Sequence, residues 1–303
     1  MKWILLIPTL LISSFLWAQP GYTLAEELHS YNGSLTFNHY KLYIQKAMKK
    51  DVLKGLEKRL ESGTRKVATV DNSKITIEKV VYKDYWSDSL VIDAEIVEAE
   101  KGTMCFFLIK LDTNVIGSKT HAELDVKIRR YLKKFGLNMY ADALDDEMNK
   151  EKKLLRSIEK EHKSALREID KSDDKVKANT VEIELKKDEI DINKADRHTK
   201  VTEMEVQKMV IVNSSDENPE QQKLEKTKLK TMKSEFKKLK TDYKKLNSQI
   251  SKMDSSSRDE ELKKEKLVIQ AKNIKDRVTA QAKVIEAVKA KQDEAEVALN
   301  VLK

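Results

Sequence analysis

The sequence predicts an α+β head with an antiparallel sheet, followed by a long all-α antiparallel coiled-coil hairpin. Composition carries the first part of this prediction. All seven glycines lie before residue 137, and residues 137–303 contain one proline, Pro219. Charged residues make up 36% of the chain, against a typical ~25%, and aromatic residues only 6%. Because glycine and proline most often end helices and form turns, we expect residues 137–303 to be long helix.

Residues 1–18 have the composition of a secretory signal peptide. A single lysine precedes an apolar run from Trp3 to Trp17, and the small residue Ala18 follows it. An uncleaved membrane anchor is the alternative, but a spanning helix needs ~20 apolar residues, and this run is shorter and contains Pro8. We therefore expect an exported protein, periplasmic or extracellular, with no membrane span once the leader is removed.

The head is expected to occupy residues 20–136 in the order β-α-β-β-β-α. Ser34–Ile44 is rich in β-branched and aromatic residues, as strands are. Lys46–Glu61 repeats apolar residues at every fourth position and ends at a Ser-Gly pair, which predicts a helix. Three further strands, joined as hairpins, are predicted by alternating or continuous apolar runs. They are Lys74–Tyr82, Ser89–Ala99 and Thr103–Leu111.

A helix is expected to close the head. Thr120 and Glu123 have the spacing of a capping box, in which a hydroxyl and a carboxylate satisfy the first amides of a helix. Apolar residues then recur at helical spacing and predict a stripe that lies on the sheet. The stripe consists of Leu124, Ile128, Tyr131, Phe135 and Met139.

The hairpin, residues 137–303, is predicted from heptad spacing. Between Leu229 and Met253 the apolar residues fall alternately three and four apart, as in the seam of a coiled coil. Polar Ser257, Glu260 and Lys264 then occupy seam positions, and the apolar register resumes unchanged. The unchanged register favours one continuous, weakened helix over a looped break near residues 254–259.

The upstream arm repeats residues every seven positions from Leu155 to Ile211 that are apolar except for His162 and Arg197, but its companion seam positions become mostly polar. Residues 213–219 carry the strongest turn signal of the tail and divide it almost evenly, which predicts an intramolecular antiparallel hairpin. Antiparallel pairing then places the polar seam positions of the two arms side by side, with Lys186 meeting Glu260. On the upstream arm these positions are Ser172, Asn179 and Lys186.

The sequence contains no recognisable catalytic, cofactor-binding or metal-binding pattern, and we expect no enzyme. The five histidines are scattered without metal-ligand spacing. Gly117–Thr120 lacks the glycines that a phosphate-binding loop requires. Cys105, the only cysteine, lies in an apolar run typical of a buried, inert thiol. The net charge of +8 comes from 59 basic and 51 acidic residues, a near balance that disfavours nucleic acid as a partner.

Tyr85 and Trp86 are the candidate contact for a partner, because they place two aromatic side chains in a turn. The alternative is that Trp86 folds over the edge of the sheet and belongs to the core. A second copy of the chain remains open as a further partner through the coiled coil.

The chain resembles uncharacterised exported bacterial proteins that join a small α+β domain to a long C-terminal coiled coil. The resemblance rests on the leader, the strand–helix–strands run of Ser34–Leu111, the entry into the tail at Lys133–Leu137, and Val284–Lys289. It implies a coiled-coil scaffold or interaction module with protein partners in the cell envelope, and it supplies no catalytic residues. The alternative is a periplasmic holdase that binds unfolded clients with its helical hairpin, as Skp-like chaperones do. In those chaperones strands return after the hairpin, whereas nothing resembling a strand follows residue 220 here.

We expect the leader to be removed during export, so that the mature chain begins near Gln19. Intact-mass measurement of protein recovered from the periplasm or the medium tests this. A mass that still includes Met1 would contradict the prediction.

Overall fold

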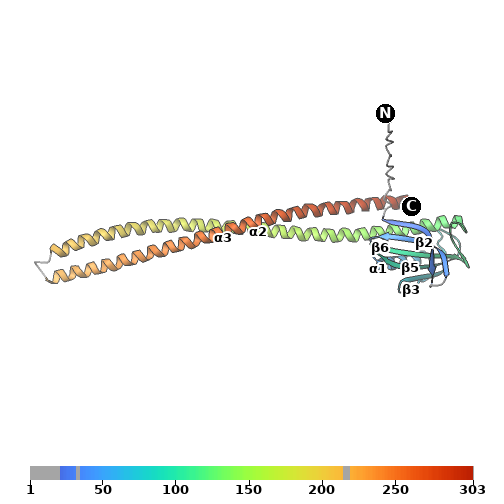
Figure 1. Ribbon diagram of the computed structural model, residues 1–303, viewed down its shortest axis with the longest axis horizontal. Helices are drawn as coiled ribbons and strands as arrows, with labels where there is room; N and C mark the ends of the chain where they lie inside the picture. Colours follow the sequence, from blue (N-terminus) through green and yellow to red (C-terminus); the bar gives the residue numbers. More distant parts are fainter. Residues whose placement is uncertain (1–20, 32–34, 214–218, 303) are drawn as a thin grey trace, which may run out of the picture. The chain divides into compact units, whose positions relative to one another are not determined.

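The computed structural model describes residues 21–31, 35–213 and 219–302 (Figure 1). The predicted leader and the centre of the predicted turn at 213–219 lie outside these residues. The chain divides into two compact units, one made of Met1–Leu155 with Ala280–Lys303 and the other of Arg156–Thr279. The first unit therefore extends past the expected boundary at residue 136 and includes the end of the last helix.

The first unit contains an antiparallel sheet in the order β1-β2-β6-β5-β4-β3, with β7 paired to β6. The helix α1, Lys49–Glu61, connects β2 to β3. The register of the central pair places Ile92 of β5 opposite Ile109 of β6. The strands are β1 (Tyr22–Tyr31), β2 (Leu35–Gln45), β3 (Thr69–Asp71), β4 (Lys74–Val80), β5 (Leu90–Ala99), β6 (Gly102–Leu111) and β7 (Asn114–Val115).

The α+β head with an antiparallel sheet is confirmed, but the predicted order β-α-β-β-β-α omits three strands. The largest omission is β1, which precedes the first predicted strand and pairs with it along ten residues. Its centre, Ala25–Leu28, consists of good helix formers, so local composition gives little strand signal. β3 and β7 have three and two residues, too few for a periodic pattern.

One face of the sheet forms the core against α1 and the start of α2, which runs from Ala122 to Asn213. The predicted stripe on this second helix is confirmed, because all five of its members are buried. Gly136 lets the helix approach the sheet, since a Cβ atom there would lie 3.0 Å from the side chain of Leu42. Alternating residues of the central strands complete this face: Leu42, Ile44, Ile75, Ile77, Ile92, Ala94, Cys105 and Phe107.

The start of α2 differs from the predicted capping box. The Thr120 hydroxyl accepts a hydrogen bond from the Gly117 amide at 2.9 Å and donates to the Val115 carbonyl at 3.0 Å. It therefore closes the turn before the helix, and the His121 carbonyl accepts the first helical bond, from Asp125. Sequence spacing alone could not show that the hydroxyl would bond to its own turn.

Charged groups also fix the first turns of α2 to the sheet. The Asp125 carboxylate accepts a hydrogen bond from the Tyr40 hydroxyl of β2 at 2.8 Å. Arg129 donates to the same carboxylate and, at 2.6 Å, to Glu26 of β1. Since these groups are largely buried, the network is a charge-assisted link between strand and helix.

The long helices α2 and α3 are continuous, and α3 runs from Pro219 to Val301. The favoured reading of residues 254–259 as unbroken helix is thus confirmed. In the first unit α3 packs beside α2, where Val288 and Ala295 join the head core and Arg130 donates to the Leu302 carbonyl at 3.1 Å. In the second unit the two helices pair with each other as an antiparallel coiled coil. Within the described residues, no helix contains an apolar stretch long enough to span a membrane.

We expect Cys105 to react slowly with thiol reagents in the native protein. Its side chain is fully buried in β6, and burial raises the pKa of its thiol, so little reactive thiolate forms near neutral pH. The measurement compares the labelling rate in buffer with that in denaturant. Equal rates would show that β6 does not form the centre of a closed core.

Candidate functional site

Tyr85 and Trp86 lie in the loop between β4 and β5, in a turn closed by hydrogen bonds of both amides to the Tyr82 carbonyl at 2.8 Å. The turn directs the two side chains differently. Trp86 is only 2% exposed and belongs to the core. Tyr85 is half-buried and lines a cavity. The structure thus has Trp86 folded into the sheet core, the alternative considered from the sequence, and leaves Tyr85 as the member of the pair that a partner can reach.

Four aromatic side chains from two segments meet here, and we call them the tyrosine cluster: Tyr82, Tyr85, Trp86 and Tyr131. The Trp86 ring lies 5.1 Å from that of Tyr82 and 5.4 Å from that of Tyr131, both edge-on. Tyr85 meets Tyr131 in the same way at 5.1 Å. Edge-to-face contacts at these distances are favourable, so the cluster fixes the loop to α2.

Arg59 of α1 completes the cluster. Its guanidinium lies 4.9 Å from the ring centre of Tyr131 and 5.8 Å from that of Tyr85, and it donates a hydrogen bond to the Tyr85 hydroxyl at 3.0 Å. Its buried Nε atom has no hydrogen-bond partner within the described parts of the chain. The aromatic faces and the Tyr85 hydroxyl therefore compensate this half-buried cation.

Two tyrosine hydroxyls satisfy the end of α1. Tyr82 donates to the carbonyl of Leu60, and Tyr131 donates to that of Arg59 at 3.3 Å. Both carbonyls lie in the last turn of the helix, where backbone acceptors lack partners in the helix. Burial raises the pKa of Tyr82 to about 12 and raises the pKa of Tyr131 as well. Both hydroxyls thus remain protonated donors at neutral pH.

The cavity beside the cluster has a volume of about 310 Å³. Its lining offers aromatic faces, hydroxyls, two cations and the carboxylate of Asp84 to a bound group. Among the described residues we find no cluster of histidine, cysteine and carboxylate side chains that could hold a metal ion. The lining residues are Arg59, Ser62, Gly63, Tyr82, Lys83, Asp84, Tyr85 and Tyr131.

Sequence reasoning found only part of this site. It identified Tyr85 and Trp86, and it placed Tyr131 on the core face of the helix. It missed Arg59 and Tyr82, because their roles arise where α1, the β4–β5 loop and α2 meet, and no spacing along the chain encodes that meeting. Arg59 also resembles an ordinary basic residue in the last turn of a helix, where cations are common.

The second unit contains another polar feature, a series of hydrogen bonds across the coiled-coil seam. Ser172 donates to Glu260 at 2.9 Å, and Asn179 donates to Ser257 at 3.1 Å. The predicted meeting of the polar seam positions is thus confirmed for these residues. Nearer the turn, Asn193 donates to the Leu239 carbonyl at 3.1 Å, and Gln207 donates to the Glu225 carboxylate at 2.5 Å.

The expected contact of Lys186 with Glu260 is wrong. Lys186 pairs with Glu189 of its own helix at 3.2 Å. Glu260 instead receives Lys175 at 2.9 Å, together with Ser172. The register explains the difference. Lys186 lies between Asn179, which faces Ser257, and Asn193, which faces Leu239, so it is too far along the arm to reach Glu260.

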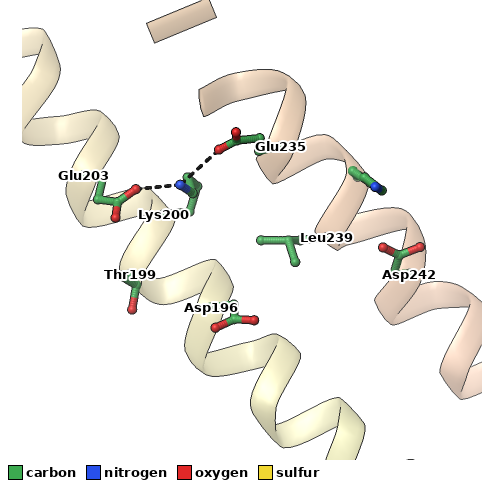
Figure 2. Close-up of a pocket in the computed structure, with 8 residues that line it drawn as sticks. Asp196, Thr199, Lys200, Glu203, Glu235, Leu239 and Asp242 are labelled. Carbon is green, nitrogen blue, oxygen red and sulfur yellow. Dashed lines mark ion pairs between the residues drawn. The ribbon is translucent and has the colours of Figure 1, made fainter. Parts of the chain in front are cut away.

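A charged pocket of about 480 Å³ lies between the two arms. Figure 2 shows the residues that line it. Lys200 of α2 lies at its centre and bonds to Glu203 at 2.7 Å and to Glu235 of α3 at 3.0 Å. These carboxylates raise the pKa of Lys200. The pocket is lined by both signs of charge, and its only apolar member is Leu239. We interpret the pocket as a solvated set of ion pairs that spans the seam, because Lys200 is already paired with Glu203 of its own helix and Glu235 of α3.

Neither known protein-family models nor curated proteins match this chain. The functional argument therefore rests on the geometry of the two units.

We expect Tyr82→Phe to destabilise the protein near neutral pH and to remove part of its alkaline sensitivity. Losing the hydroxyl leaves the Leu60 carbonyl without its donor, at a cost of about 1–3 kcal/mol. Because the pKa of Tyr82 is raised in the folded state, the native protein loses stability as pH rises from the unfolded pKa near 10 towards 12, by about 2–3 kcal/mol for this group. The variant lacks that loss.

Urea unfolding of both proteins at pH 8 and pH 11 measures the difference. We expect the stability gap between wild type and variant to narrow at pH 11. A gap of constant size would mean that Tyr82 ionises as easily in the folded protein as in the unfolded one.

Proposed function

We propose that this protein is a non-enzymatic, exported envelope protein that acts as a coiled-coil scaffold or interaction module. The observation that carries the proposal is the seam of the second unit. At several heptad positions, polar side chains of α2 form hydrogen bonds with α3 across this seam, all in one register. The expected export comes from the sequence of the leader, and the envelope partners come from the resemblance described above.

The polar contacts of the seam specify its register. Asn193 lies three heptads after Ser172, and its acceptor Leu239 lies three heptads before Glu260. Gln207 and Glu225 follow two heptads further in the same sense. A slip by one heptad would break these contacts together and leave buried polar groups unsatisfied, at about 1–3 kcal/mol each. Such side chains reduce the stability of a seam but fix its pairing.

A fixed register favours the scaffold proposal over a holdase that opens its arms to bind clients. A holdase needs apolar surfaces that clients can reach between its arms. Here the inner apolar positions of both arms pack against each other, as Ile158 and Ala165 of α2 do with Ala271 and Ile274 of α3. Opening the arms would expose this surface and break the polar contacts as well. The holdase is therefore the weaker of the two candidates.

We expect no suppression of aggregation when an equimolar amount of the protein is added to an unfolded outer-membrane protein diluted from urea. Light scattering measures the outcome, with a known holdase as the positive control. A second experiment uses the variant Asn179→Cys/Ser257→Cys. A short bis-maleimide cross-links the two cysteines and holds the facing positions of the two helices together. Suppression that disappears on cross-linking would identify a clasping chaperone and overturn the scaffold proposal.

A further inference from the structure

The outer side of α2 carries a second apolar stripe in the second unit. Its nine positions alternate four and three residues apart, which is the spacing of a coiled-coil seam. The five large apolar members are each more than half exposed, with Ile192 at 63% and Met209 at 66%. We call the nine positions the back stripe: Val181, Leu185, Asp188, Ile192, Ala195, Thr199, Thr202, Val206 and Met209.

The back stripe is distinct from the seam that pairs α2 with α3. Each stripe position follows a seam position by two residues, as Leu185 follows Ile183 and Ile192 follows Ile190. Two residues turn a helix by about 200°, so the stripe faces largely away from α3, although its member Thr199 also lines the pocket between the two arms. The burial agrees, because Ile183 and Ile190 are buried whereas Leu185 and Ile192 are exposed.

The stripe is long enough for a helix to dock along it. Val181 and Met209 are separated by about 40 Å along the helix axis. The Thr202 hydroxyl donates to the His198 carbonyl of its own helix at 3.2 Å, which satisfies its donor and reduces the polarity of the stripe. Asp188, Thr199 and Thr202 interrupt the stripe, but a folded protein seldom exposes five large, aligned apolar side chains without a partner.

The charges beside the stripe are almost all negative. At the eight flanking positions, seven residues are acidic and one is His198. Glu189, Asp191 and Glu203 form ion pairs with lysines of their own helix. The remaining four have no ion pair within the described residues. The seven acidic positions are Glu182, Glu184, Glu189, Asp191, Asp196, Glu203 and Glu205.

Three other occupants are excluded, two by the charge of these flanks and one by its lack of apolar side chains. The same stripe of a second copy would bring acidic flanks against acidic flanks, as would an anionic lipid surface. The outer side of α3 in a second copy is rich in lysine, and its corresponding positions from Thr227 to Ser255 hold only threonine, serine and lysine. Those polar side chains cannot supply the apolar knobs that the stripe requires, and Leu262 and Ile269 are the large apolar residues at later such positions.

We propose that the back stripe docks an amphipathic helix of another protein, whose apolar residues repeat three and four apart between flanking lysines or arginines. Apolar knobs would pack between stripe residues such as Leu185 and Ile192, and the basic flanks would meet the unpaired carboxylates of residues such as Glu182 and Glu205. This inference rests on the proposed function as an interaction module and names the chemistry of its partner.

The test uses the full chain and a labelled helical peptide of about 28 residues with leucine at the seam positions and lysine at the flanks. A second peptide has the same leucines with glutamate at the flanks. We expect the lysine peptide to bind at least about tenfold more tightly, as measured by fluorescence anisotropy, and its affinity to fall with added salt. Equal binding of both peptides, or of neither, would overturn the proposal.

Matched variants locate the contact. Leu185→Gln/Ile192→Gln should weaken binding of the lysine peptide by about tenfold or more, because it removes two central knobs. Leu262→Gln/Ile269→Gln, which changes two equally exposed residues on α3, should leave binding unchanged. Circular dichroism should show equal helix content in all three proteins, since the four side chains are exposed. Loss of binding in the α3 variant alone, or in both variants alike, would overturn the assignment to the back stripe.

Two further measurements test whether the back stripe binds a second copy of the chain or a membrane surface instead. A dimer of the wild type in sedimentation that disappears in Leu185→Gln/Ile192→Gln would assign the stripe to a second copy. Binding to phosphatidylglycerol vesicles that the same variant abolishes would assign it to a membrane surface. Either result overturns the proposal for a basic helix. None of these outcomes repeats the aggregation assay, so failure of this inference is distinguishable from failure of the scaffold proposal.

Discussion

The burial of one face of α2 is the interaction on which the rest of the structure depends. In the first unit this face closes the core of the sheet, with Ile128 and Phe135 fully buried. In the second unit the seam face packs on α3, through residues such as Ile158 and Ile183. Both environments require apolar side chains three and four residues apart, so one unbroken periodicity serves a sheet and a helix. This explains why the helix needs neither glycine nor proline after Gly136.

Apolar burial and polar contacts have different roles along this helix. The head is held by a dense core in which Arg59 and the tyrosine hydroxyls complete the end of α1. The second unit has a thin core, because each seam layer contributes only a few side chains. Its polar contacts therefore represent a larger share of the interface and decide which layers face each other. Apolar burial is therefore the main stabilising contribution in the first unit. In the second unit, the polar contacts determine how α2 and α3 pair.

Much of this architecture was predictable because it is periodic. The seam of α3 continues through Ser257 and Glu260 without a change of register, and periodicity alone indicated the unbroken helix. The strand β1 was not predictable from local pattern, because its stability comes from pairing with β2 rather than from its own composition. The same limit applies to Lys186, whose nearest carboxylate is on its own helix. The cavity beside Tyr85 depends on Arg59, and only the packing of α1 against the β4–β5 loop and α2 brings the two side chains together.

The polar contacts of the seam also restrict how this fold can vary in length. Removing seven residues from one arm alone would move Asn193 away from the Leu239 carbonyl and Gln207 away from Glu225. Removing seven from both arms, at facing positions, would keep every remaining layer in place and shorten the pair by about 10 Å. The length of the second unit can therefore change only in steps of whole heptads. Insertions and deletions can be accommodated in whole heptads, paired across the two helices, and other length changes require the whole seam to be redesigned.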